Sequence, residues 1–304
     1  MSERLQAFAL MGATGTGKSA LAMQLAGELQ TSIICCDSMQ LYKELDIGTA
    51  KPSQAERDLV PHFLVDCCEL PDLYSAARWA REARVVIADE NEQGRVPLIV
   101  GGTGLYLKAL LHGFADIPDE KPEIRGKFET LLWVEGTEGL FRYLQAHDAV
   151  MAGRLEANDS QRIMRALCVL ESTGRSLADW QSEATSEVGE IDCPVFVLDV
   201  EREILRERLA IRCQSMIESG WLDEVRWLAK LNLPDTHPAM RAVGYRQLLD
   251  HLQGELSLEK AISDTITATR RYAKRQVTWF NHQTPEAVHG TAEELKEKMT
   301  GLLS

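Results

Sequence analysis

The sequence lacks the long apolar run that a membrane-spanning helix requires. No stretch of the 304 residues approaches the ~18 consecutive apolar residues of such a helix, although 45% of the residues are hydrophobic. The first residues, Met1 to Arg4, do not begin the pattern of a signal peptide. We therefore expect a soluble, cytoplasmic protein that does not associate with a membrane.

The cysteines show neither a disulfide framework nor the spacing of a metal site. There are 7 of them, an odd number, and no two stand in C-x-x-C spacing. Two adjacent pairs, Cys35-Cys36 and Cys67-Cys68, lie in apolar runs. We expect reduced thiols in the protein core.

Basic residues are in the minority. Lys and Arg number 33 against 46 Asp and Glu, which gives a formal net charge of −13. Proteins that attract nucleic acid over a broad surface usually carry a basic footprint, so the net charge argues against that class. A polyanionic partner would have to meet a local cluster, of which Arg270–Arg275 is the strongest with four cations in six residues. The same cluster also fits a solvated helix face.

What is present is a full phosphate-loop motif, G-x-x-x-x-G-K-[ST], at Gly12–Ser19. The apolar run Ala7–Met11 before it predicts a buried strand, and Ala20–Ala26 after it predicts a helix. Lys18 would reach the terminal phosphates of a di- or triphosphate, and the Ser19 hydroxyl would coordinate Mg²⁺. We assign the whole loop to substrate binding: Gly12, Ala13, Thr14, Gly15, Thr16, Gly17, Lys18 and Ser19.

Two further strand ends carry polar side chains. Asp37 follows the predicted strand Ile33–Cys36, and Thr103 lies in the turn Gly101-Gly102-Thr103-Gly104 after the predicted strand Leu98–Val100. Ligands of open parallel sheets bind outside the carboxyl ends of the strands, so we expect both side chains near the phosphate loop. Asp37 fits an Asx turn or a helix N-cap equally well, and the glycine turn also fits a tight connection without a ligand.

The alternation of strands and helices stops between residues 113 and 192 and returns with the strand Pro194–Asp199. We predict a P-loop NTPase-like α/β fold: a parallel sheet flanked by helices forms a catalytic core from 1–112 and 193–304, and 113–192 form a helical insertion domain. The remaining expected elements are a strand over 63–66, helices over 75–92, 105–111, 124–134, 137–147, 160–171, 202–219, 221–231 and 258–281, and a helix that opens within 241–246.

Five blocks, in order, resemble the tRNA dimethylallyltransferases (tRNA isopentenyltransferases, the IPP transferase family) of the bacterial type. They are 12–19, 37–43, 46–52, 101–106 and 243–247. The resemblance implies transfer of a dimethylallyl group from dimethylallyl pyrophosphate to N6 of the adenosine at position 37 of the tRNA, 3′-adjacent to the anticodon. It also implies Mg²⁺ and release of pyrophosphate.

The resemblance assigns roles to residues. Asp37 matches the general base, and Thr103 and Arg212 match residues that steady the leaving pyrophosphate. The insertion would contact the tRNA anticodon stem-loop, and the protein would act as a monomer. The residues that match tRNA contacts are Asp37, Ser38, Met39, Gln40, Thr103, Arg125, Gln161, Arg162, Ile163, Met164, Arg165, Arg241, Ala242, Val243, Gly244, Tyr245 and Arg246. Without the resemblance, Gln161, Arg162 and Arg165 read as a solvated helix face.

Two other classes of function remain open to the motifs themselves. A small-molecule kinase would use ATP at the same loop, with Asp37 activating a hydroxyl acceptor. A nucleotide-dependent RNA-binding switch would need no chemistry, and the convergence of a carboxylate, a hydroxyl and a cation disfavours it. An exocyclic adenine amine is a poor nucleophile, so prenyl transfer requires a base and a stabilised leaving group, both of which the motifs supply.

Overall fold

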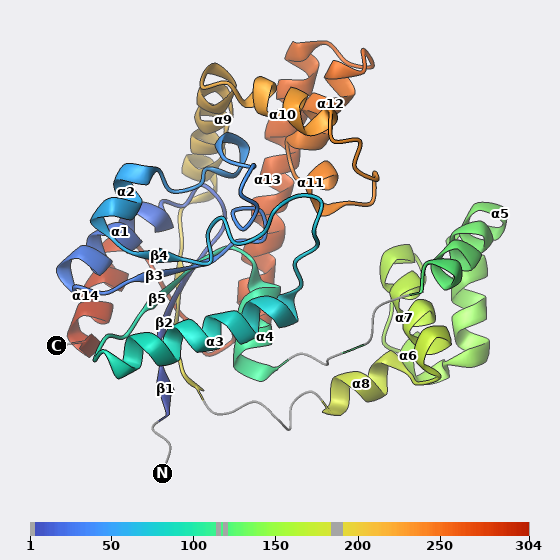
Figure 1. Cartoon of the computed structure of the whole chain (residues 1–304), viewed down its shortest axis with the longest axis horizontal. Coiled ribbons are helices and arrows are strands. Elements are labelled where there is room, and N and C mark those ends of the chain that lie inside the picture. Colours follow the sequence, from blue (N-terminus) through green and yellow to red (C-terminus); the bar gives the residue numbers. More distant parts are fainter. Residues whose placement is uncertain (1–3, 114–116, 118–120, 184–190, 304) are drawn as a thin grey trace. The chain divides into compact units, whose positions relative to one another are not determined.

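The computed structural model describes residues 4–113, 117, 121–183 and 191–303. The chain forms two compact units, one from Met1–Leu111 with Glu190–Ser304 and the other from His112–Gly189 (Figure 1). Within the described residues no helix has both the length and the apolar character needed to cross a membrane. All seven cysteines are free thiols, and five of them are buried: Cys35, Cys36, Cys68, Cys168 and Cys213.

The first unit is built on a parallel sheet of six strands. In sheet order they are β4 (His62–Phe63), β3 (Ile33–Cys36), β5 (Leu98–Gly101), β2 (Phe8–Met11), β7 (Val195–Leu198) and β8 (Val288–Gly290). Two short strands, β1 (Leu5–Gln6) and β6 (Ile191–Asp192), pair separately. The four central strands are continuous apolar runs because helices cover both faces of the sheet. The predicted parallel α/β fold is confirmed.

Alternate strand residues separate the core into two layers. One face packs against α1 (Lys18–Glu28) and α14 (Ala292–Leu303). The other face packs against α3 (Ala76–Glu92), α4 (Gly104–His112) and the long helix α13 (Leu258–Gln283) (Figure 1). This arrangement leaves the carboxyl ends of the strands open to a ligand.

Further helices complete the first unit. They are the 3₁₀ turn η1 (Ile47–Thr49), α2 (Gln54–Leu59), α9 (Arg202–Glu218), α10 (Trp221–Ala229), α11 (Pro238–Arg241) and α12 (Tyr245–Leu252). Helices α9 and α12 pack directly on α13, and α10 packs on α9, α12 and η1. The loops between these helices therefore form walls above the sheet edge.

One predicted element of this unit is corrected, one is confirmed, and two elements were not predicted. The strand expected over 63–66 ends at Phe63, because Leu64 and Asp66 adopt φ of 57° and 56°. The helix expected to open within 241–246 begins at Tyr245, inside that range, after Gly244 with φ of 90°. Strand β8 and helix α14, which complete one edge of the sheet, were not predicted.

The second unit is entirely helical in its described residues. It contains α5 (Pro122–His147), α6 (Ala149–Ala152), α7 (Ser160–Thr173) and α8 (Leu177–Glu183). The two helices predicted over 124–134 and 137–147 are the two halves of α5, which kinks at Gly136 with φ of 69°. Its core includes Phe128 and Leu144 of α5 and Leu167 of α7. The unit thus has a hydrophobic centre of its own.

Candidate active site

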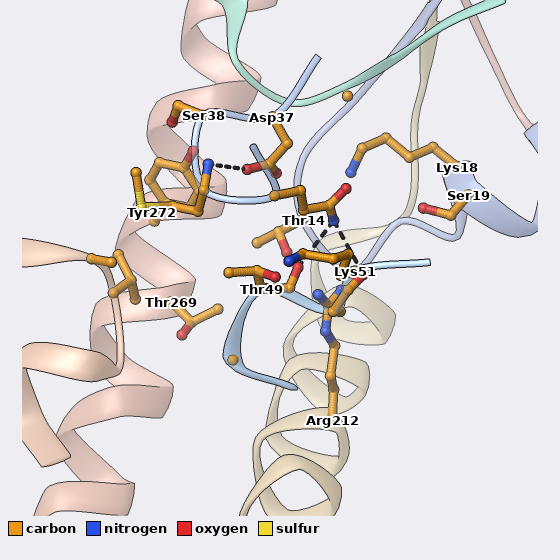
Figure 2. A pocket seen from close by; sticks show the side chains of 18 of the residues that line it. Thr14, Lys18, Ser19, Asp37, Ser38, Thr49, Lys51, Arg212, Thr269 and Tyr272 are labelled. Atoms are coloured by element: carbon orange, nitrogen blue, oxygen red, sulfur yellow. Dashed lines mark hydrogen bonds between the residues drawn. The ribbon is translucent and has the colours of Figure 1, made fainter. Parts of the chain in front are cut away.

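A cavity of about 690 Å³ opens in the first unit at the carboxyl ends of the central strands. Its walls include the phosphate loop after β2, the segment from Asp37 after β3, and Gly101 at the end of β5. Figure 2 shows Lys18, Asp37 and Arg212 around this space, with Thr269 and Tyr272 of α13. Residues from distant parts of the chain therefore meet in one site.

The phosphate loop has the predicted strand, turn and helix. Gly17, with φ of 95°, precedes α1, which begins at Lys18. Gly15 adopts φ of 84°, and a Cβ there would lie 2.6 Å from Leu209 Cδ2, so this position requires glycine. The Thr16 hydroxyl donates to the Ala13 carbonyl at 2.9 Å and closes the turn.

The Lys18 ammonium lies in this loop at the cavity and donates to the Ala13 carbonyl at 3.3 Å. Burial lowers its pKa to about 8, although the nearby Asp37 carboxylate opposes the shift and Arg212 adds to it. Burial also lowers the pKa of the Arg212 guanidinium, again against the charge of Asp37. Both cations are partly stripped of water, which suits them to an anionic ligand.

Asp37 is held in the turn that the sequence allowed as an alternative. Its Oδ1 accepts the Met39 N–H at 2.9 Å, which forms an Asx turn. A carboxylate can accept several hydrogen bonds, so the turn does not exhaust this group. Asp37 also lines the cavity, and the structural and the chemical interpretations are therefore compatible.

Thr103 supports the turn from behind. Its hydroxyl accepts the Ser38 N–H at 3.1 Å, and its own N–H donates to the Cys36 carbonyl at 3.1 Å. Among the described residues Thr103 is not one of those that line the cavity. In this structure its contacts position the Asp37 segment.

Two residues that hold the phosphate loop were missed by sequence reasoning. Arg208 lies one helical turn before Arg212 on α9, and its Nη1 donates to the Thr16 carbonyl at 3.2 Å. The buried Gln276 of α13 accepts the Thr14 N–H at 2.9 Å and donates to the Gly102 carbonyl at 2.9 Å. The i, i+4 spacing of the two arginines was a usable signal for Arg208.

Helix α13 presents a polar stripe along the cavity. Thr265, Thr269, Tyr272 and Gln276 recur at helical spacing, and all four line the cavity. Gln276 lies eleven residues after Thr265, so the stripe spans about 16 Å of helix. Gln276 touches the phosphate loop, whereas a Cβ on Gly244 would lie 3.2 Å from Thr265 Cγ2, so the stripe joins two opposite ends of the site.

The far end contains several of the residues that match tRNA contacts. Met39 and Gln40 line the cavity together with Arg241, Ala242, Val243 and Tyr245. Gln40 donates through Nε2 to the carbonyls of Thr49 and Ala50 at 3.0 and 3.1 Å. Arg246 lies just beyond them and is exposed.

In the second unit the predicted contact residues differ in exposure. Gln161 and Arg162 are exposed at the start of α7. The side chains of Ile163 and Met164 are buried in the core of the unit, and the contact of this segment with tRNA stays a prediction. Arg165 is half-buried, and Arg125 pairs with Glu129 at 3.0 Å on α5.

Two protein-family models match this chain. A model described as IPP transferase matches residues 40–283, and one described as isopentenyl transferase matches residues 5–67. The chain belongs to the IPP transferase family.

Curated members of the family match this chain over nearly its whole length. A tRNA dimethylallyltransferase of Azorhizobium caulinodans is 43% identical over 305 residues, which cover 99% of this chain and 98% of that protein. One from Rhodospirillum centenum is 45% identical over 278 residues, or 90% of this chain and 87% of that protein.

Solved structures of the family agree. The tRNA isopentenylpyrophosphate transferase of Bacillus halodurans superposes with a TM-score of 0.71 at 31% identity and covers 99% of this chain and 97% of its own. A eukaryotic dimethylallyltransferase acting on tRNA gives a TM-score of 0.77 at 27% identity over 95% of this chain and 74% of its own.

Proposed function

We propose that this member of the IPP transferase family transfers a dimethylallyl group from dimethylallyl pyrophosphate to N6 of the adenosine 3′-adjacent to the anticodon of tRNA. The products are N6-(dimethylallyl)adenosine and pyrophosphate. One observation carries the proposal: a single cavity joins the phosphate loop, Asp37 and the segment around Arg241. A donor and an acceptor can therefore meet at the carboxylate. The names of the relatives favour this activity over a kinase.

The phosphate-loop end suits the pyrophosphate. Lys18 and Arg212 are cations that border the cavity, and the α1 N-terminus adds the partial positive charge of its free N–H groups. Charge develops on the leaving pyrophosphate as the allylic C–O bond breaks, so fixed cations here lower the barrier. Thr103 would act by holding the Asp37 turn in place.

Asp37 suits the adenine amine. The new bond forms between the allylic carbon and N6, the C–O bond breaks with its electron pair leaving on pyrophosphate, and the N6 proton passes to the Asp37 carboxylate. The target adenine must leave the base stack of the tRNA to reach the cavity, which costs little in a single-stranded anticodon loop. The Asx turn fixes the direction of the Asp37 carboxylate before the adenine binds.

We expect Mg²⁺ to be held mainly by the pyrophosphate and water, and not by a cluster of protein side chains. In the described part of the chain no three His, Cys, Asp or Glu side chains gather as a metal site. The Ser19 hydroxyl lies on the first turn of α1 at the cavity, and Mg²⁺ normally keeps water and phosphate ligands. When bound, the ion would neutralise charge on the pyrophosphate.

We also assign tRNA contacts to both units. In the first unit the exposed Arg241 and Arg246 flank the cavity segment. In the second unit Gln161, Arg162 and Arg165 with Arg125 are the polar residues of the predicted set, and they are the proposed contacts of the insertion with the anticodon stem-loop.

The test is transfer with defined substrates. The purified protein is incubated with Mg²⁺, a tRNA carrying adenosine at the position 3′ of the anticodon, and dimethylallyl pyrophosphate labelled in the prenyl group. Label should enter that tRNA, and a matched transcript with guanosine at the position should stay unlabelled. ATP labelled in its terminal phosphate is the control donor. Phosphorylation without prenyl transfer would establish the kinase alternative and overturn the proposal.

A further inference from the structure

One carboxylate outside the five sequence blocks accepts hydrogen bonds from four donors in two separate segments. Glu224 lies in the first turn of α10. Its Oε2 accepts the N–H groups of Asp46 and Ile47 at 2.8 and 2.7 Å. Its Oε1 accepts the Gly48 N–H at 3.1 Å and the Tyr245 hydroxyl at 2.5 Å. Glu224 therefore bonds two segments that are far apart in the sequence.

The three N–H groups belong to the start of η1. Asp46 is the N-cap of this turn and makes no side-chain capping bond to it. The first N–H groups of any helical turn lack partners within it, and a negative charge at that end is favourable. Glu224 therefore caps η1 from another helix.

The capped segments form a wall of the cavity. Gly48, Thr49 and Ala50 line it on one side, and Val243 and Tyr245 on the other. Trp221, one turn before Glu224 on α10, fills the space between them. A Cβ on Gly48 would lie 2.0 Å from Trp221 Nε1, and a Cβ on Gly244 would lie 2.0 Å from Trp221 Cη2. Helix α10 thus packs and bonds both segments with one face.

The wall is linked to the catalytic turn. Gln40 bonds the carbonyls of Thr49 and Ala50 and lies three residues after Asp37. The phosphate loop, by contrast, is held by Gln276 and Arg208. A change at Glu224 should therefore reach the acceptor end of the cavity before the donor end.

We propose that Glu224 is a positioning residue for the tRNA acceptor: it sets the two segments that receive the target nucleoside and has little effect on the donor. This rests on the proposed function. Only an ionised carboxylate can accept four donors, because the amide of glutamine has one oxygen and turns two N–H groups toward them. Glu224→Gln keeps the size of the side chain and should disrupt the hydrogen bonds that hold the two segments.

The experiment compares Glu224→Gln with Asp223→Asn. Asp223 is the neighbouring acidic residue, its side chain is exposed, and it pairs with Arg226 on the same helix. In steady-state transfer, Glu224→Gln should raise KM for the tRNA anticodon stem-loop about tenfold and lower kcat, with KM for dimethylallyl pyrophosphate within about twofold of wild type. Asp223→Asn should leave both constants unchanged.

Tyr245→Phe is the second variant, because it removes one of the four donors and keeps the ring. It should shift KM for the stem-loop in the same direction by about threefold, and it serves if Glu224→Gln does not fold. Equal changes in both KM values, or a lower melting temperature with neither KM changed, would overturn the proposal. A wild-type protein that transfers nothing would instead refute the proposed function, and the role of Glu224 with it.

Discussion

Asp37 combines a hydrogen bond in its own turn with a place on the cavity wall. Asp37→Asn keeps an oxygen that can accept the Met39 N–H, so the turn should survive, but it removes the base. We expect the rate of transfer to fall by on the order of 10² to 10⁴ while both substrates still bind. Single-turnover transfer with both substrates saturating measures this. A variant with the wild-type rate and a lower melting temperature would limit Asp37 to its turn.

Lys18 makes donor binding depend on pH. Because burial lowers its pKa to about 8, the free protein loses this cation above that pH, and binding of a pyrophosphate then requires uptake of a proton. The dissociation constant of the donor should rise above pH 8 by up to about tenfold per pH unit. Calorimetric titrations from pH 7 to 10 would show it.

The matched control is Lys18→Arg, whose guanidinium stays charged through this range and should give a flatter profile. The same pKa has an opposite effect on stability. Between about 8 in the folded state and 10.5 in the unfolded state, the unfolded chain binds more protons, so the free energy of unfolding of the ligand-free protein rises with pH. A donor affinity that is constant from pH 7 to 10 would contradict the low pKa.

At the scale of elements, α13 connects the phosphate loop to the rest of the site through Gln276. Gln276→Leu leaves the half-buried Thr14 N–H and the buried Gly102 carbonyl without this partner, which should lower the free energy of unfolding by about 2 to 4 kcal/mol and weaken donor binding. Urea denaturation and donor titration measure the two effects.

Gln283→Leu is the control on the same helix, because Gln283 is exposed and accepts a hydrogen bond from the exposed Lys108 at 3.2 Å. It should change neither quantity appreciably. Equal effects of the two substitutions would mean that α13, and not its bond to the loop, accounts for the loss.

The elements predicted correctly share a local signal. Strands β2, β3, β5 and β7 are apolar throughout because both faces are buried, and the phosphate loop is defined by adjacent residues. Strand β8 is three residues long at the sheet edge and carries an exposed His289, so it shows no such run. The end of β4 depends on positive φ at Leu64, which the sequence does not announce.

In the site, too, only the residues with a local signal in the sequence could be predicted. Asp37 and the phosphate loop follow from their places at strand ends, a rule that needs only the order of elements. The roles of Gln276 and Glu224 do not, since each bonds backbone groups that lie more than 170 residues away in the sequence. Such contacts exist only after the chain has folded.

At the scale of the whole molecule, the formal charge of −13 opposes RNA binding, and exposed cations on α13 must offset it locally. Arg271→Ala with Lys274→Ala should lower the slope of log K against log salt by about 0.7 to 0.9 for each lost phosphate contact. Filter binding of tRNA over a range of salt concentrations measures the slope. Lys260→Ala, on the same helix and paired with Asp264 at 2.6 Å, is the control. An unchanged slope in the double variant would place the phosphate contacts elsewhere.

The position of β2 between β5 and β7 has a consequence for synthesis on the ribosome. Ala9 pairs with Ile99 on one side and with Val195 on the other, so β2 gains its second neighbour only after the whole helical unit has been translated. At roughly 5 to 20 residues per second, the nascent sheet waits on the order of 5 to 20 seconds with one side of its central strand unpaired. An open strand edge invites pairing with another chain. Because the second unit has a core of its own, we expect it to fold during that interval. Strand β7 would then follow a folded unit in the chain, and not a long unfolded segment, when it pairs with β2.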